Sequence, residues 1–160
     1  MSKEDELVAE FWAALESDRM VMLGLTAAED GHTRPMTVQL DENKHSIWFF
    51  TSKHAPLVQK LESDSSACVT FVSKNYSIFA SVHGMLVQNN APEMIDKLWN
   101  DQVAKWYTGK TDPAIALLNF TPEKAEIWRQ ESSFIAGFKV LFGVDPKNLY
   151  KGNVAKVKLA

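Results

Sequence analysis

Short runs of β-type residues, separated by turn residues, restrict the fold of this chain more than any other feature. The runs cover residues 19–26, 32–40, 47–52, 67–73, 76–88, 117–128 and 154–159. Short turns join the first three runs, as in an antiparallel meander. The sequence therefore predicts a mainly β (α+β) fold, an antiparallel barrel of about six strands with flanking helices, in a single domain over residues 1–160.

Helical patterns occupy several of the segments between these runs. The N-terminal segment repeats apolar residues at helical spacing behind a possible capping box of Ser2 and Asp5. Pro56 and Pro92 each suit the first turn of a further helix. Residues 133–143 also show mixed helical spacing. These patterns predict helices inserted between the strands rather than a separate helical domain.

Two residues predict irregularities in the longer strands. Gly84 lies inside the run 76–88, where it indicates a bulge or a bend at which a barrel could close. Pro122 lies inside the run 117–128 and predicts an interruption there, because proline cannot donate to a strand ladder.

Composition limits the classes of function. The chain has 160 residues, 46% hydrophobic and 23% charged, which is usual for a globular protein. Its formal net charge of −3 argues against a surface devoted to nucleic acid or to an anionic membrane. Cys68 is the only cysteine, so no intrachain disulfide can form. Because the N-terminus is acidic and no apolar run approaches the ~18 residues of a membrane span, we expect a cytoplasmic protein.

Common catalytic and metal-binding motifs are missing from the sequence. The four histidines show no metal-ligand spacing and have no cysteine pair beside them, so no metal site is expected. The chain contains no Gly-x-Ser-x-Gly nucleophile motif, no glycine-rich phosphate loop and no dinucleotide-binding fingerprint. An oligonucleotide-binding barrel would fit the strand count, but the acidic balance of the chain argues against its basic groove.

Arg34 is the first residue that indicates a binding site. Alternation along a strand places it on the same face as Met36, Val38 and Leu40, which are apolar. A guanidinium on an apolar face is unfavourable unless it is paired. Its partner could be a carboxylate of the protein, which would make an internal salt bridge, or an anionic ligand such as a phosphate.

The stretch Ile47-Trp48-Phe49-Phe50-Thr51-Ser52-Lys53 adds a second indication. It combines a flat apolar wall with two hydroxyls and a cation at its end, which are the groups that a phosphorylated ring cofactor needs. We therefore consider a flavin mononucleotide (FMN) site. The alternative is that Thr51, Ser52 and Lys53 form only a solvated turn that caps the following helix.

The order of these features resembles a known family over nearly the whole chain. The matching segments are Arg34-Pro35-Met36, Ile47 to Lys53, Gly84, Leu98-Trp99, Lys105-Trp106-Tyr107 with Gly109 and Asp112-Pro113, and Ala125-Glu126-Ile127-Trp128. With these, the chain resembles the pyridoxamine 5′-phosphate oxidase-like FMN-binding split barrels, and within them the general stress protein 26 group. No single motif is diagnostic, whereas their order and spacing together are specific.

The resemblance implies a homodimeric flavoprotein with FMN in a cleft between the subunits. By position, the residues around the ribityl phosphate would be Arg34, Thr51, Ser52 and Lys53, and those bordering the ring would be Met36, Thr37 and Phe50. Trp128 would reach the flavin from the partner subunit. The flavin would carry out the oxidoreductase chemistry with a small-molecule substrate or electron donor, and no catalytic residue is assigned to the protein itself.

This sequence departs from the family pattern at the start of the short helix. Ala55 and Leu57 stand where the family has a serine and a lysine associated with the phosphate. Losing two charge-assisted hydrogen bonds could weaken affinity by roughly two to four decades. The residues around 78–81, polar in the oxidase, are largely apolar here, so pyridoxamine phosphate oxidation itself is not expected.

Two alternatives to an FMN-dependent oxidoreductase therefore remain open. In the first, the protein is a split-barrel dimer that has lost tight flavin binding and acts as a non-catalytic ligand-binding or stress-related module. In the second, the same cleft holds another cofactor, such as a deazaflavin or haem, although no axial ligand for haem is evident.

Overall fold

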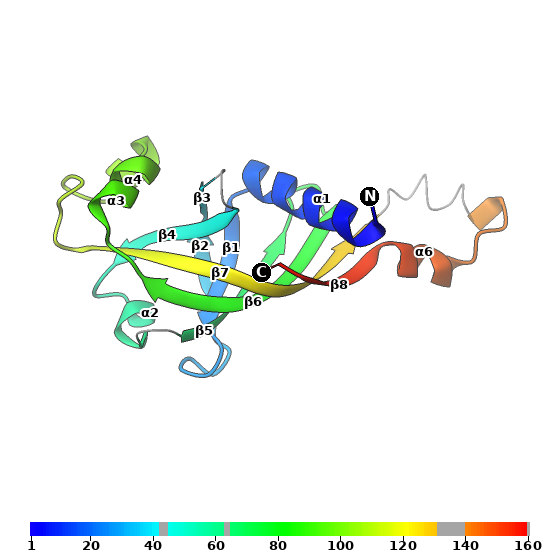
Figure 1. Ribbon diagram of the computed structural model, residues 1–160, viewed down its shortest axis with the longest axis horizontal. Coiled ribbons are helices and arrows are strands. Elements are labelled where there is room, and N and C mark those ends of the chain that lie inside the picture. The colour runs from blue at the N-terminus through cyan, green and yellow to red at the C-terminus, as the bar shows by residue number, and fades with distance from the viewer. Residues whose placement is uncertain (42–44, 63–64, 131–139, 160) are drawn as a thin grey trace.

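The computed structural model describes residues 1–41, 45–62, 65–130 and 140–159 (Figure 1). Its helices are α1 (Lys3–Ser17), α2 (Pro56–Gln59), α3 (Pro92–Leu98), α4 (Asp101–Ala104) and α6 (Pro146–Gly152). Its strands are β1 (Met20–Leu25), β2 (Arg34–Thr37), β3 (Gln39–Asp41), β4 (Ser46–Ser52), β5 (Ser65–Val72), β6 (Ile78–Gln88), β7 (Ile115–Arg129) and β8 (Val154–Lys158).

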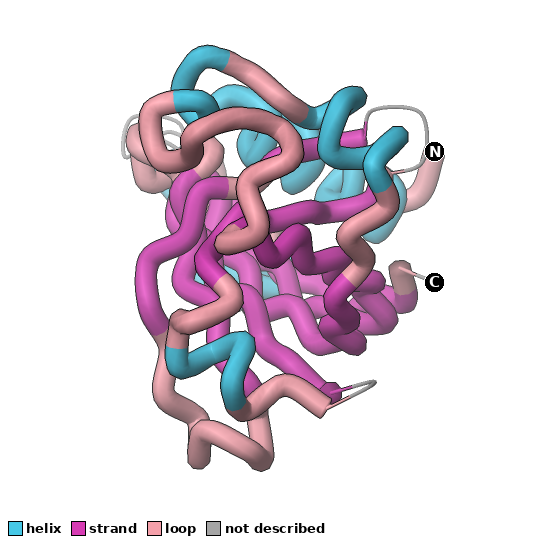
Figure 2. Tube along the Cα trace, turned by 90° about the vertical axis from the view of Figure 1, so that its left-hand side faces the viewer, coloured by secondary structure: helices cyan, strands magenta, loops and turns pink. Residues whose placement is uncertain are grey.

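The strands form one antiparallel sheet in the order β2-β1-β5-β6-β7-β4-β3, with β8 paired to β7. Seen along its long axis, the sheet curls around an interior (Figure 2). This is a split barrel with flanking helices, which confirms the predicted mainly β fold. None of the described helices combines the length and the apolar character needed to cross a membrane.

A bend at Val38 brings the two ends of the sheet together. β2 and β3 lie at opposite ends of the strand order, yet only Val38 separates them in the chain. Val38 is fully buried, and its N–H donates to the Arg19 carbonyl at 2.7 Å. The predicted continuous strand 32–40 is therefore two short strands. Both antiparallel pairings of the predicted meander are found, but on separate halves of this segment: β2 pairs with β1, and β3 pairs with β4.

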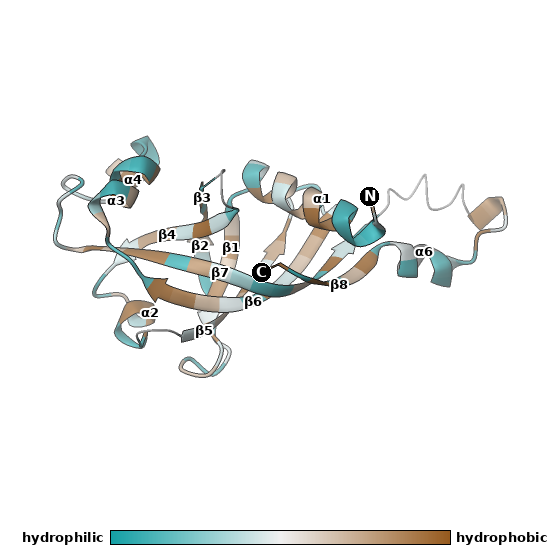
Figure 3. Ribbon diagram, viewed as in Figure 1, coloured by the Kyte–Doolittle hydropathy of each residue, from teal (hydrophilic) through white to brown (hydrophobic). Residues whose placement is uncertain are grey.

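The main core lies between the curled sheet and α1. The apolar stripe of α1 contributes Leu7, Phe11 and Leu15, all fully buried, and the helix contacts β6, β7 and β8. The capping box of Ser2 and Asp5 forms as predicted and satisfies backbone donors of the first turn. Hydrophobic residues follow the strands, whereas α4 and α6 are mainly hydrophilic (Figure 3).

A bulge at Gly84 confirms the irregularity predicted in β6. The register between β6 and β7 shifts between His83 and Gly84, so that Gly84 lies opposite Pro122. A Cβ at Gly84 would collide with the backbone of Thr121. β7 continues as a strand through Pro122, but its ladder is irregular there as predicted, because Glu123 beside the proline is the extra residue of the bulge.

A smaller core lies on the opposite face of β4 and β7, under α3 and α4. Its buried residues are Trp48, Ile95, Leu98, Ile115 and Leu117. Polar contacts fix the two helices to β3: Lys97 donates to Asp41 at 3.0 Å, and Asn100 donates to Gln39 at 3.0 Å. These two contacts hold the helices beside the beginning of β4, because Asp41 and Gln39 pair with Ser46 and Trp48.

Three predictions concern the chain ends and turns. The last strand forms as β8, whereas α6 was not predicted. Most of the helical pattern in 133–143 lies outside the described residues, and so do positions 42–44 of the predicted turn between β3 and β4.

Candidate functional site

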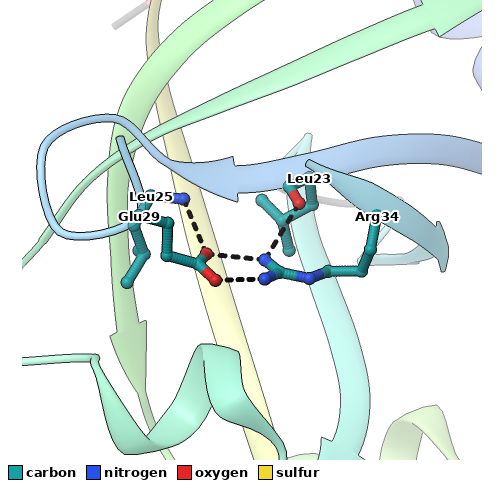
Figure 4. Close-up of polar contacts among 4 residues, drawn as sticks. All are labelled: Leu23, Leu25, Glu29 and Arg34. Atoms are coloured by element: carbon teal, nitrogen blue, oxygen red, sulfur yellow. Dashed lines mark hydrogen bonds and ion pairs between the residues drawn. The ribbon is translucent and has the colours of Figure 1, made fainter. Parts of the chain in front are cut away.

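Arg34 lies on the inward face of β2 and pairs with Glu29 (Figure 4). Its Nη1 donates to Glu29 Oε1 at 2.6 Å and to the Leu23 carbonyl at 3.2 Å, and its Nη2 donates to Glu29 Oε2. Oε1 of Glu29 also accepts the Leu25 N–H at 3.1 Å. The alternation predicted for this strand is confirmed, since Met36 packs on the core beside Arg34. Of the two partners considered for Arg34, the protein supplies a carboxylate.

The Glu29 carboxylate is held in its ionised form. Its side chain is 1% exposed, whereas that of Arg34 is 21% exposed. The hydrogen bond from Arg34 lowers the pKa of Glu29, against the effect of burial, and the charge of Lys60 lowers it further. The two charges of the pair therefore compensate each other at neutral pH.

Glu29 is the residue that the sequence analysis missed. It belongs to the turn after β1, where its neighbours Asp30 and Gly31 take positive φ angles. The signal that could have found it is its position in the sequence, five residues before Arg34. A tight turn between β1 and β2 brings residues at this separation side by side. A carboxylate there satisfies the guanidinium that the apolar strand face cannot.

The end of β4 presents the other polar residues predicted for the site. Thr51 and Ser52 are half-buried, and Lys53 is exposed. Ser52 Oγ accepts the His54 N–H at 3.1 Å, and the Lys53 carbonyl accepts from Gln59 at 2.7 Å. These contacts form a strand-to-helix turn, as the alternative explanation of these residues proposed.

The two departures from the family pattern have different structural consequences. Ala55 is the N-cap of α2, and its side chain makes no capping hydrogen bond. Leu57 is 2% exposed and belongs to the main core, so it contributes packing in place of a cation. The first turn of α2 therefore offers backbone groups but no charged side chain at these positions.

β2 and β4 contact each other across the barrel and bring part of the predicted site together. Alternation places Thr51 on the inward face of β4, the side on which Arg34 and Met36 lie on β2. Thr37 points the other way and is exposed. Phe50 also points outward and packs against Trp99 and Tyr107, with ring centroids 6.0 and 6.4 Å away.

The loop before β7 approaches the exposed cation of the site. Asp112 accepts the Thr108 and Ala114 N–H groups, each at 2.9 Å, and these bonds lower its pKa. The charge of Lys53 lowers this pKa further, and the Lys53 N–H donates to the Ala114 carbonyl at 2.9 Å, so Lys53 lies beside this loop. Burial raises the pKa of Tyr107 beside it, and the charge of Asp112 acts in the same direction.

Trp128 lies far from these residues within one chain. It is near one end of β7, whereas Ile115 at the other end pairs with Ser52. Trp128 lines a groove of about 540 Å³ on the outer sheet face. The remaining lining residues are Ser81, His83, Lys124, Ala125, Glu126, Lys156, Val157 and Lys158.

An apolar row crosses the outer sheet face beside this groove. Cross-strand pairing places Val72, Phe79, Trp128 and Val154 side by side on β5, β6, β7 and β8. Val72 is 47% exposed, and Met20 on β1 is 57% exposed. Within the described part of the chain, no group of three or more His, Cys, Asp or Glu residues could hold a metal ion.

Solved structures of general stress proteins resemble this fold closely. A general stress FMN/FAD binding protein of Xanthomonas citri is 49% identical, with a TM-score of 0.76, over 81% of this chain and 92% of that one. A general stress family protein of Xanthomonas campestris pv. campestris is 46% identical, with a TM-score of 0.77, over 83% and 93%. General stress protein 26 of Jannaschia sp. CCS1 is 28% identical, with a TM-score of 0.76, over 97% and 99%.

Sequence comparison gives the same assignment. General stress protein 26 of Bacillus subtilis (strain 168) is 27% identical over 95 residues, which are 58% of this chain and 66% of that protein. This chain thus matches just under two thirds of the length of that relative. Residues 6–147 match the family described as pyridoxamine 5′-phosphate oxidase like. The chain therefore belongs to the pyridoxamine 5′-phosphate oxidase-like family, in which it is similar to the general stress proteins.

Proposed function

We propose that this protein is an FMN-binding oxidoreductase. In this proposal the phosphate of the bound FMN lies between β2 and the end of β4. The carrying observation is that β2, which holds Arg34, contacts β4, which ends at Thr51 and Ser52 just before Lys53, although β2 and β4 lie far apart in the strand order. Arg34, Thr51 and Lys53 supply a guanidinium, a hydroxyl and an ammonium group, which are donors suited to a phosphate. The similarity to the Xanthomonas citri protein, which is named an FMN/FAD binding protein, supports a flavin.

The hydrogen-bond donors at this position fit the phosphate of FMN, but their net positive charge is smaller than the number of cationic side chains suggests. Arg34 remains partly accessible, and Lys53 is exposed at the end of β4. Thr51 and Ser52 add hydroxyl groups beside them. Glu29, however, compensates Arg34, and Leu57 is buried in the core. Binding should therefore depend on the ring and the ribityl chain as well as on the phosphate.

A homodimer would supply the rest of the site. Within one subunit Trp128 cannot meet the residues at the end of β4, because they lie toward opposite ends of the paired strands. The apolar row with Trp128 and Val72 is accessible on the outer sheet face. We propose that a second copy covers this row and that each Trp128 contacts the flavin of its partner.

Bound flavin would supply hydride or single-electron transfer to a small-molecule substrate or electron donor. The residues of this chain would hold and orient it, with Arg34 and Lys53 at the phosphate and Met36 near the ring. Thr37, predicted beside the ring, lies on the opposite face of β2 from Met36 and would not share this side of the strand. Phe50 would act less directly, by fixing the outer wall of β4 against Trp99 and Tyr107. No side chain is assigned as an acid or a base. A cytoplasmic location, expected from the sequence, remains part of this proposal.

The test is reconstitution with FMN followed by gel filtration. Wild-type protein should retain a flavin absorption spectrum, and Lys53→Glu should retain clearly less, because it repels the phosphate. Lys147→Glu on α6 is the matched control, since Lys147 is also exposed but lies on a different element. If wild-type protein retains no flavin at any FMN concentration, the proposed function is wrong.

A second candidate function has structural support of its own. Ala55 offers no capping side chain, Leu57 is buried, and Glu29 neutralises Arg34. Together these features would suit a split-barrel dimer that binds flavin weakly and serves as a ligand-binding module. Protein that remains colourless after reconstitution, yet is a folded dimer, would favour this candidate.

A further inference from the structure

Glu29 is positioned to hold Arg34 and is closed to solvent. Its side chain is 1% exposed, and both of its carboxylate oxygens accept hydrogen bonds from Arg34 (Figure 4). The Leu25 N–H, at 3.1 Å from Oε1, ties the same carboxylate to the end of β1. Part of the Arg34 side chain remains accessible. A ligand could therefore approach the cation of this pair but not the anion.

This geometry decides how much charge an approaching anion would experience. A guanidinium fully paired with a carboxylate presents a nearly neutral group to a third charge. Of the other cations, Lys53 and Lys60 are exposed, so water and salt screen their attraction for an anion. Glu29 therefore sets how much charge Arg34 adds to that of Lys53 at the proposed phosphate end.

We infer that Glu29 determines the specificity of the flavin site, by neutralising Arg34 and so reducing the preference for phosphorylated over unphosphorylated flavin. The inference rests on the function proposed above. It predicts that the site takes flavins with or without a terminal phosphate. Riboflavin, which has the ring and ribityl chain of FMN but no phosphate, should bind within about two orders of magnitude of FMN.

Variants of the pair separate charge from shape. Glu29→Gln removes the negative charge with little change in size and leaves Arg34 uncompensated. Because a phosphomonoester carries about −1.5 to −2 charges at pH 7, the ratio of the Kd for riboflavin to the Kd for FMN should rise about tenfold. Arg34→Gln instead removes the positive charge of the pair and leaves the negative charge of Glu29. It should therefore lower this ratio below the wild-type value.

Two controls test whether charge is the cause. Glu29→Asp keeps the charge but shortens the side chain, so the ratio should stay within about twofold of wild type. The double variant Glu29→Gln/Arg34→Gln is neutral at both positions, as the wild-type pair is overall. Its ratio should therefore return close to the wild-type value.

The measurement is titration of each flavin by fluorescence quenching, with riboflavin and FMN as the probes. Both titrations sample the same folded fraction of a variant, so partial unfolding cancels in the ratio. If wild-type protein binds FMN and the ratio for Glu29→Gln is unchanged or lower, this inference is overturned and the proposed function stands. If neither wild type nor Glu29→Gln binds either flavin, both are overturned. FMN binding gained only in Glu29→Gln supports this inference and contradicts the proposed function of the wild-type chain.

Discussion

At the scale of single residues, the pair of Arg34 and Glu29 links stability to the candidate site. Alternation along β2 predicts that Arg34 needs an anionic partner. From the sequence, that partner could be either a carboxylate of the protein or an anionic ligand. The hairpin geometry selects Glu29, which lies five residues away in the chain. Removing either member leaves a charge with reduced solvation, so the pair has a structural role whatever else it binds.

The stability contribution of Glu29 should depend on pH. Its pKa in the folded protein is below the ordinary 4.5, so its stabilisation is complete above pH 4.5 and is lost as pH falls through the folded value. We expect Glu29→Gln to lower the free energy of unfolding by about 1–3 kcal/mol at pH 7. Urea unfolding should show this difference shrinking below pH 4.5. In contrast, Glu123→Gln, at an exposed position, should change the free energy of unfolding little at pH 7. If the loss caused by Glu29→Gln stays constant down to pH 3, Glu29 does not have a lowered pKa in the folded protein.

Ala55 provides a second test at this scale, because restoring a hydroxyl there should act on both folding and binding. Ala55→Ser should cap α2, raise stability by about 0.5–2 kcal/mol and tighten FMN binding. Ala91→Ser is a matched control, since Ala91 is also an uncapped N-cap before a proline, on α3. Thermal unfolding should show a gain for both variants, whereas FMN titration should show a gain for Ala55→Ser alone. If Ala55→Ser binds FMN no more tightly than the wild-type protein, the phosphate does not lie beside α2.

At the scale of elements, the sequence predicted most strands and helices but not how the barrel closes. The period-two runs and the capping box of α1 are local signals, and the structure confirms them. The break at Val38 is not local, because it depends on which strands β2 and β3 pair with. The continuation of β7 as a strand through Pro122 likewise depends on Gly84 in the neighbouring strand. The pattern predicts the candidate polar residues of the site, whereas the pairing of Arg34 with Glu29 became evident only from the fold.

The bulge provides a test of this non-local dependence. Gly84→Ala would place a Cβ against the backbone of Thr121, so we expect a loss of about 1–3 kcal/mol in the free energy of unfolding. Gly109→Ala is the control, because no atom lies within 4 Å of a Cβ built there. Chemical denaturation of both variants should separate the effects. An equally mild change at Gly84 would show that the bulge can relax away from β7.

At the scale of the whole molecule, the two parts of the proposed site lie toward opposite ends of β7. One part is built from Arg34 and the end of β4, and the other is the outer groove with Trp128. A single subunit keeps them apart, so we expect a second copy to join them. The accessible row that includes Val72 is the surface on which we expect that copy to dock.

Mixed dimers can show whether each flavin site is shared between two subunits. Lys53→Glu weakens binding of the FMN phosphate in its own subunit, whereas Trp128→Ala removes the contact with the flavin of the partner subunit. A homodimer of either variant should therefore retain little FMN. In a dimer with one copy of each, one site carries both substitutions and the other carries neither. Purified through two different tags, such dimers should retain about one FMN per dimer. Mixed dimers that retain no more flavin than either parent would contradict a site shared between subunits.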